Sequence, residues 1–227
     1  MLSAIAIIPS APVLVPELAG SAAAEVADLR AAVLSAAALL PPRWVVVGAA
    51  DADAVFGSDA VATFAGFGVD VPVQLSPGAG EATDLPLCGQ IAGWVRGWAR
   101  PEASAQVRVW RGDHDAGAAL AAGRRLRAEL DEAADAVGVL VVADGANTLT
   151  ATAPGGHDPD AALAQLVLDD ALAEADLAAL AGLPGQILGR VAFQVLAGLA
   201  EPGPRWAKEL YRGSPYGVGY FAGAWQP

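Results

Sequence analysis

Three short, largely apolar runs place the strongest constraint on how this chain can fold. They are Ala4–Ile8, Arg43–Gly48 and Val137–Ala143. Each lacks helical period and ends near Pro, Gly or Asp, which is typical of strands buried on both faces. Between them lie longer segments whose apolar residues recur every three to four positions, which indicates helices. This alternation predicts an α/β fold, a three-layer α/β/α sandwich with a central mixed, partly parallel sheet.

The remaining segments complete this scheme. Helices are predicted over Ser21–Leu40, Pro86–Trp98, Asp115–Ala136, Asp160–Leu180 and Gln186–Leu199. Further strands are predicted over Val69–Leu75, Val107–Trp110 and Tyr216–Ala222. Pro72 cannot donate a hydrogen bond to a neighbouring strand, so its strand is expected at a sheet edge. The chain of 227 residues is long enough for one large core, and we expect a single domain over 1–227.

Charge and cysteine content exclude several classes of protein. The net charge is -12, and no cluster of Lys and Arg with interleaved aromatic residues appears. We therefore expect no nucleic-acid partner and no binding to anionic membranes. No apolar stretch reaches the roughly 20 residues needed to span a bilayer. The single cysteine, Cys88, permits no internal disulfide and is expected to be a buried apolar residue. These features predict a cytoplasmic protein.

Polar residues follow the third apolar run directly. The run passes into Asp144-Gly-Ala-Asn147-Thr-Leu149 and then into a Gly-Gly-His157-Asp-Pro turn. Open α/β folds keep their ligand sites at the carboxyl ends of the strands, so this loop is a candidate site. Asp144 is expected to orient a partner or to accept hydrogen bonds within the turn, and Asn147 to bind a substrate through its amide. His157 is either a site residue or a surface residue before a helix.

A second candidate lies after the predicted strand Val107–Trp110. Here Asp113 precedes His114 at the entry to a helix. His114 is a candidate general base or hydrogen-bond donor to a substrate; the alternative is a purely structural role at the helix entry. Asp51 and Asp53 leave the strand Arg43–Gly48 as a carboxylate pair, and Asp51 is a candidate for the same site.

Three segments together resemble the catalytic subunit of class III extradiol ring-cleavage dioxygenases, the LigB-like family, whose fold the Memo proteins share. They are Pro9-Ser-Ala-Pro-Val-Leu-Val-Pro-Glu17, the loop from Asp144 to Leu149 with Gly155-Gly-His-Asp-Pro159, and Tyr211-Arg-Gly-Ser-Pro-Tyr-Gly-Val-Gly-Tyr220. The likeness runs along nearly the whole chain in the family's order. It implies a LigB-like fold and a pocket that includes Ser10 and Tyr216, with Asp113 and His114 matching a retained Asp-His pair.

The resemblance fails at the residues that would hold iron. Ser10 stands where the family has its first metal-binding histidine, and Gly48-Ala-Ala-Asp51 where a second is usual. Asn147 stands where the family has its acid/base histidine. Arg212 or Gly213 takes the place of a carboxylate. Because Fe(II) in that family needs two imidazoles and a carboxylate, the sequence predicts no bound metal and no cofactor.

Three hypotheses of function follow. The first is a LigB-like protein without the iron site, which binds a small molecule, such as an aromatic compound, or a protein partner. The second is a metal-independent enzyme with His114 as base and Asp51 or Asp144 as its partner. The third is an Fe(II) dioxygenase with the rearranged ligands Asp51, His114 and His157. The acidic, Trp-bearing surface is also compatible with a homodimer.

Overall fold

A seven-stranded mixed sheet forms the centre of the molecule in the computed structural model, which describes all residues from Met1 to Pro227. The strands follow the order β3-β7-β2-β8-β1-β10-β9. Their bounds are β1 Leu2–Ile8, β2 Arg43–Ala50, β3 Ala54–Phe56, β7 Ser104–Arg111, β8 Val137–Val142, β9 Trp206–Gly213 and β10 Tyr220–Gln226. The inner four strands, β7, β2, β8 and β1, are parallel, whereas β3, β10 and β9 pair antiparallel.

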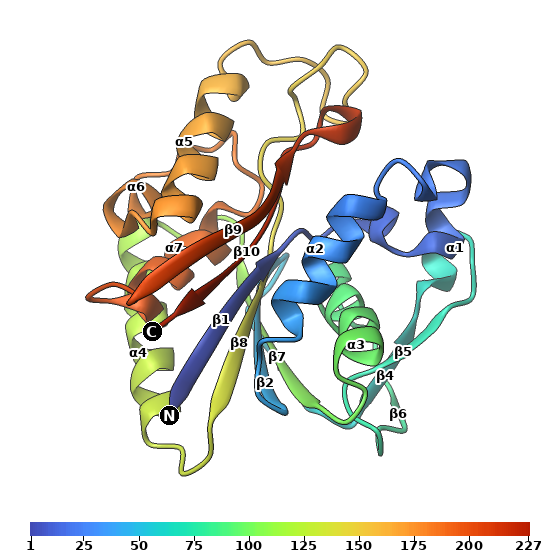
Figure 1. Ribbon diagram of the computed structural model, residues 1–227, viewed down its shortest axis with the longest axis vertical. Coiled ribbons are helices and arrows are strands. Elements are labelled where there is room, and N and C mark those ends of the chain that lie inside the picture. Colours follow the sequence, from blue (N-terminus) through green and yellow to red (C-terminus); the bar gives the residue numbers. More distant parts are fainter.

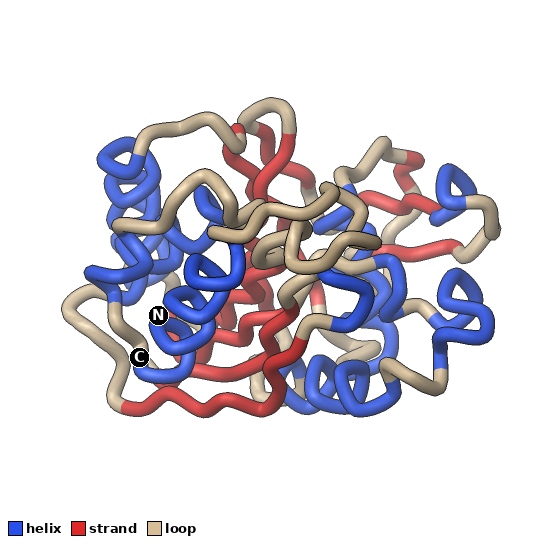
Figure 2. Tube along the Cα trace, turned by 90° about the horizontal axis from the view of Figure 1, so that it is seen from above, coloured by secondary structure: helices blue, strands red, loops and turns tan.

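The three apolar runs form the centre of this sheet. All six residues of β8 are buried, as are Ile5 to Ile8 of β1 and Trp44 to Gly48 of β2. Strands buried on both faces need other elements to cover both faces of the sheet. The structure shows helices on both (Figures 1 and 2). The predicted three-layer α/β/α sandwich with a mixed, partly parallel sheet is therefore confirmed.

The helices divide between the two faces. One face carries α2 (Ala27–Ala37) and α3 (Leu87–Ala99), with the short α1 (Pro16–Ala19) beside them. The other carries α4 (Ala116–Asp131), α5 (Ala161–Glu174), α6 (Leu177–Ala181) and α7 (Arg190–Ala200). Each face has its own apolar core, and side chains alternate between them, so that Ile8 joins one core and Ile7 the other.

Helices α4 and α7 pack against each other more extensively than any other helix pair. Glycines make the approach possible at the crossing point. A Cβ on Gly123 of α4 would lie 2.7 Å from the backbone nitrogen of Leu199, and a Cβ on Gly198 of α7 would lie 2.9 Å from the carbonyl carbon of Leu120. Two helix backbones are thus in direct contact above the sheet.

Several predicted helices differ from the observed ones in length. The helix predicted over Ser21–Leu40 begins only at Ala27, because residues 20–23 form a 3-10 turn. The helix predicted to reach Ala136 ends at Asp131. The helix predicted over Asp160–Leu180 is two helices, since Ala175 adopts a left-handed conformation (φ 56°) and Asp176 caps α6 with its carboxylate.

The strand predictions also need correction. Only Pro72–Gln74 of the segment Val69–Leu75 is a strand, β5, and it is an edge strand of a separate small sheet with β4 (Ala60–Thr63) and β6 (Glu81–Ala82). The C-terminal strand covers Tyr220–Gln226 instead of Tyr216–Ala222. The strand β9 was not predicted. No helix is both long enough and apolar enough to cross a bilayer.

Candidate functional site

The carboxyl ends of β1, β2 and β8 surround a cavity of about 210 Å³. Parallel strands end at the same edge of a sheet, so residues that follow them are brought together there. The walls are mainly apolar and come from both helical layers as well as from the strands. The lining residues are Ser10, Ala49, Leu87, Cys88, Val142, Ala143, Asp144, Leu188 and Gly189.

Asp144 supplies the carboxyl group of this cavity. Its Oδ1 accepts a hydrogen bond from the backbone N–H of Ser10 at 2.7 Å, which joins the residues that follow β8 and β1. Burial raises the pKa of Asp144 to about 7, against the opposing effect of the Ser10 hydrogen bond. The carboxyl group can therefore gain or lose a proton near neutral pH.

Cys88 contributes a thiol to the same cavity, from the first turn of α3. Only 3% of the residue is exposed. Burial raises the pKa of the thiol to about 11, so it stays protonated at neutral pH and is a poor nucleophile. This agrees with the prediction of a buried apolar cysteine.

Gln165 of α5 fixes the loop that carries Asp144, and sequence reasoning missed it. Its Oε1 accepts a hydrogen bond from Ala146 N at 2.8 Å, and its Nε2 donates to Asp169 Oδ1 at 2.8 Å. The side chain lies so close to Gly145 and Gly219 that a Cβ on Gly145 would lie 2.7 Å from Gln165 Cδ. The available signal was a long polar side chain on the helix face that otherwise carries buried alanine and leucine.

Asn147 and His157 belong to the outer part of this loop and do not line the cavity. Asn147 is half-buried and packs against Gly155, whose N–H donates to the Asn147 carbonyl at 3.0 Å. His157 is exposed and forms an isolated β-bridge with Leu149. Both residues lie where the chain folds back on itself, and in the structure their contacts serve to close the loop.

Tyr216 lies apart from the cavity as well. It is 44% exposed and adopts a left-handed backbone conformation (φ 61°) in the turn before β10. Its hydroxyl donates to Glu25 Oε2 at 2.6 Å. Arg212, on the neighbouring strand β9, forms ion pairs with Asp170 and Glu209.

His114 lies at the end of β7 and has a carboxylate partner, but a different one from that predicted. Its Nε2 is 2.8 Å from Asp53 Oδ1 and 3.0 Å from Asp53 Oδ2. Asp53 also accepts a hydrogen bond from the backbone N–H of Arg111 at 2.7 Å. The two hydrogen bonds, that from Arg111 having the larger effect and that from His114 the smaller, hold the pKa of Asp53 below its usual value. Asp51 is exposed, and Asp113 pairs with Arg111 at 2.7 Å. The expected partnership of His114 with Asp51 or Asp144 is thus replaced by one with Asp53.

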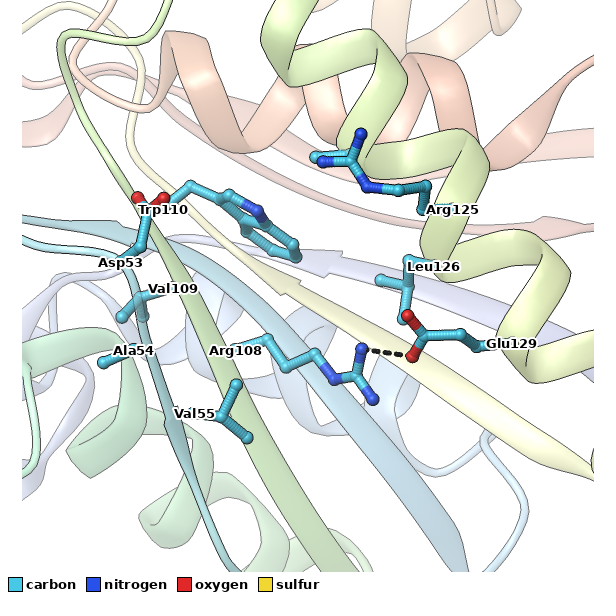
Figure 3. Close-up of a pocket in the computed structure, with 10 residues that line it drawn as sticks. Asp53, Ala54, Val55, Arg108, Val109, Trp110, Arg125, Leu126 and Glu129 are labelled. Atoms are coloured by element: carbon cyan, nitrogen blue, oxygen red, sulfur yellow. Dashed lines mark hydrogen bonds and ion pairs between the residues drawn. The ribbon is translucent and has the colours of Figure 1, made fainter.

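Asp53 marks one end of a groove of about 410 Å³ between β7 and α4 (Figure 3). Trp110 and Arg108 of β7 form its floor, and Arg108 Nη1 donates to Glu129 Oε2 of α4 at 2.6 Å. Arg125 lies above them on α4 and is exposed. The His114–Asp53 pair therefore borders a polar groove distinct from the cavity around Asp144.

Arg190 connects the two regions. It directly follows Gly189 of the cavity wall, and its Nη2 donates to the carbonyls of Gly112 at 3.2 Å and His114 at 3.1 Å. Some of the predicted site residues thus lie at neighbouring positions on one sheet edge, whereas Asn147, His157 and Tyr216 do not. Ser10 and Asp144 share the cavity, and His114 and Asp113 lie in the loop after β7.

Metal-ligating side chains are not grouped in this structure. No set of three or more His, Cys, Asp or Glu residues lies in a position to hold a metal ion, so Asp51, His114 and His157 do not converge. The cavity itself offers one carboxyl group, one serine hydroxyl and one buried thiol.

Comparisons with known proteins identify a shared fold and no more. No family model and no curated protein matches the chain. Among solved structures, the crystal structure of the uncharacterized protein JW3007 from Escherichia coli K12 is similar, with a TM-score of 0.60 over 98% of this chain and 99% of that chain. The two sequences are 11% identical, so this match establishes a similar fold only.

Proposed function

We propose that this chain is an iron-free relative of the LigB-like family that binds a small, uncharged, ring-sized molecule in the cavity around Asp144. The observation that carries the proposal is the cavity itself: mainly apolar walls with a single, partly buried carboxyl group, at the carboxyl edge of parallel strands. The family resemblance supports the same location, because two of its three segments contribute Ser10 and Asp144.

Size and polarity favour this class of ligand. An apolar cavity of about 150 Å³ in a protein can bind benzene, and the cavity here has a volume of about 210 Å³. Asp144 can donate a hydrogen bond when protonated and accept one when ionised. A phenolic or similar ring would place its polar group on Asp144 and its apolar face against Val142 and Leu188.

The residues of the cavity do not fit Fe(II). A non-heme Fe(II) site needs two imidazoles and a carboxylate, and here Ser10 and Ala49 occupy the strand ends where the resemblance implies histidines. A serine hydroxyl is a weak ligand, and the Cys88 thiol is held protonated by burial. We therefore propose a binding function without a resident metal.

The proposal is tested by measuring binding of phenol and catechol with ligand-observed NMR. We expect saturation transfer to both rings in the native protein. Ala49→Leu should abolish it, because the larger side chain fills the cavity; Ala151→Leu, at an exposed loop position, is the matched control. Equal transfer with Ala49→Leu and native protein would place the ligand elsewhere. Tight, stoichiometric Fe(II) binding in anaerobic dialysis would overturn the iron-free assignment.

A second candidate function rests on the His114–Asp53 pair. A histidine held at 2.8 Å from a carboxylate and bordering a 410 Å³ groove is suited to general acid/base chemistry without a metal. His114→Ala distinguishes the two functions: a metal-independent enzyme loses turnover, whereas binding of phenol in the Asp144 cavity is unchanged.

The setting of the protein completes the proposal. One buried cysteine and an acidic surface suit a cytoplasmic protein.

For assembly we propose a homodimer, with exposed apolar residues such as Leu163 and Leu166 of α5 as the contact surface. Sedimentation measurements test this: a concentration-independent monomer for the native protein would refute it. A protein partner in place of a second copy remains the alternative use of this surface.

A further inference from the structure

A third pocket, unrelated to the strand ends, lies where the small sheet meets α3. It has a volume of about 470 Å³ and is lined by β4, β5, α3 and one residue of α1. These elements lie side by side on the right of Figure 1. Apolar walls come from Val61, Pro72 and two tryptophans, Trp94 and Trp98, whose rings lie 6.1 Å apart.

Arg96 is the unusual residue of this pocket. Only 2% of it is exposed, and no carboxylate pairs with it. Its Nε donates to the carbonyl of Gln74 at 2.8 Å, and its Nη1 donates to the carbonyls of Pro101 at 2.5 Å and Ala103 at 3.2 Å. These bonds hold the guanidinium plane of this pocket-lining residue in a fixed position.

The second terminal nitrogen of Arg96, Nη2, has no hydrogen-bond partner in the protein. Gln90 Oε1 is the only side-chain nitrogen or oxygen that is both fully enclosed and without a hydrogen-bond partner. Since Arg96 Nη2 also has no partner, it is not fully enclosed and is still within reach of solvent. Because Arg96 lines the pocket, its free N–H groups are available to a ligand there. A buried guanidinium with no carboxylate in direct contact favours an anionic group, and its charge-assisted hydrogen bonds are strong.

Two further features define the ligand. Glu17 lines the same pocket and is exposed, which places a negative charge at the rim. Trp98 is 66% exposed and gives the pocket a large apolar wall. The pocket therefore offers a buried cation, an exposed anion and an indole surface among its lining residues.

We propose that this pocket binds a small zwitterion with an apolar side chain, such as an apolar α-amino acid. The carboxylate accepts hydrogen bonds from Arg96 Nη2, the ammonium group lies near Glu17, and the side chain packs against Trp98. This site is separate from the Asp144 cavity, and either can exist without the other.

The test uses isothermal titration calorimetry with L-leucine and two analogues that each lack one charged group. We expect L-leucine to bind. 3-Methylbutylamine, which lacks the carboxylate, should bind at least about tenfold more weakly than L-leucine, because Arg96 Nη2 stays unpaired. 4-Methylpentanoate, which lacks the ammonium group, should bind roughly two- to fivefold more weakly, because the contact to an exposed carboxylate contributes less.

Variants at the rim keep the test independent of Arg96, whose loss would disturb the fold. Glu17→Gln should remove the difference between L-leucine and 4-methylpentanoate, and Trp98→Ala should weaken L-leucine binding roughly fivefold. Glu132→Gln, at an exposed position directly after α4, and Ala49→Leu, in the Asp144 cavity, should leave L-leucine binding unchanged. No binding of L-leucine by native protein, or equal binding of L-leucine and the amine, would overturn the proposal.

Discussion

The contact between α4 and α7 allows a prediction of stability with a defined magnitude. In Gly198→Ala, the new Cβ would lie 2.9 Å from the carbonyl carbon of Leu120 and closer still to its oxygen. Ordinary carbon contacts are about 3.5–4.0 Å, and the obstacle is backbone, so α4 must move away from α7. Overpacking of this kind costs about 1–3 kcal/mol, or more where backbones meet. The gain in helix propensity of about 1 kcal/mol offsets part of this. Because both obstacles are backbone atoms, the cost is taken at the upper end, about 3 kcal/mol, and we expect the free energy of unfolding to fall by about 2 kcal/mol.

The matched control is Gly97→Ala in α3. Gly97 is also helical, but it is exposed and nothing would lie within 4 Å of its Cβ. This substitution should raise the free energy of unfolding by about 0.5–1 kcal/mol, because alanine loses less backbone entropy than glycine. Urea unfolding followed by circular dichroism, with equal m-values required for the comparison, measures both variants. A Gly198→Ala protein as stable as the native one would refute the close approach of the two helices.

Three more predictions concern the Asp144 cavity and its loop. The folded-state pKa of Asp144, about 7, lies above the ordinary value of 3.8. The folded protein therefore binds this proton more tightly than the unfolded chain does, and the free energy of unfolding falls as the pH rises from about 4 to about 7. Asp144→Asn should flatten this dependence, whose upper limit is about 4 kcal/mol, in unfolding curves recorded across that range. Gln165→Leu should cost about 2–3 kcal/mol in urea unfolding and speed hydrogen exchange at Ala146, since it leaves Ala146 N–H and Asp169 without a partner; unchanged exchange would contradict the assigned role. Cys88 should resist a thiol reagent at pH 8 in the folded protein and react fully in urea, and rapid labelling of the native state would show that the thiol is not buried as described.

The centre of the fold could be predicted because its strands carry a strong local signal. Val137–Val142 is wholly apolar and bounded by turn residues, which leaves few alternatives to a buried strand. β9 gives no such signal, since Lys208, Glu209 and Arg212 interrupt any apolar alternation on a partly exposed strand. The break between α5 and α6 was missed because alanine is a strong helix former, and a left-handed Ala175 depends on tertiary contacts that propensity does not describe.

The sequence predicted only those parts of the candidate site whose positions follow from the ends of the strands. Asp144 and Ser10 follow neighbouring parallel strands, and the structure brings them within a hydrogen bond. Whether Asp51 or Asp53 pairs with His114 depends on the conformation of the turn after β2. The sequence shows two carboxylates in this loop but not which of them faces His114. Gln165 was missed because its role arises from the approach of α5 to two glycines far away in the chain.

The hydrogen bond between Ser10 and Asp144 makes different demands on the two residues that it joins. Ser10 takes part through its backbone N–H, which every residue except proline can supply. The side chain at this position can therefore change, for example from the histidine that the family resemblance implies to serine, without loss of the junction between the ends of β1 and β8. Asp144 has no such freedom, because its side-chain oxygen is the acceptor. The junction between the two strand ends therefore requires the carboxyl group of Asp144 but places no such requirement on the side chain of residue 10.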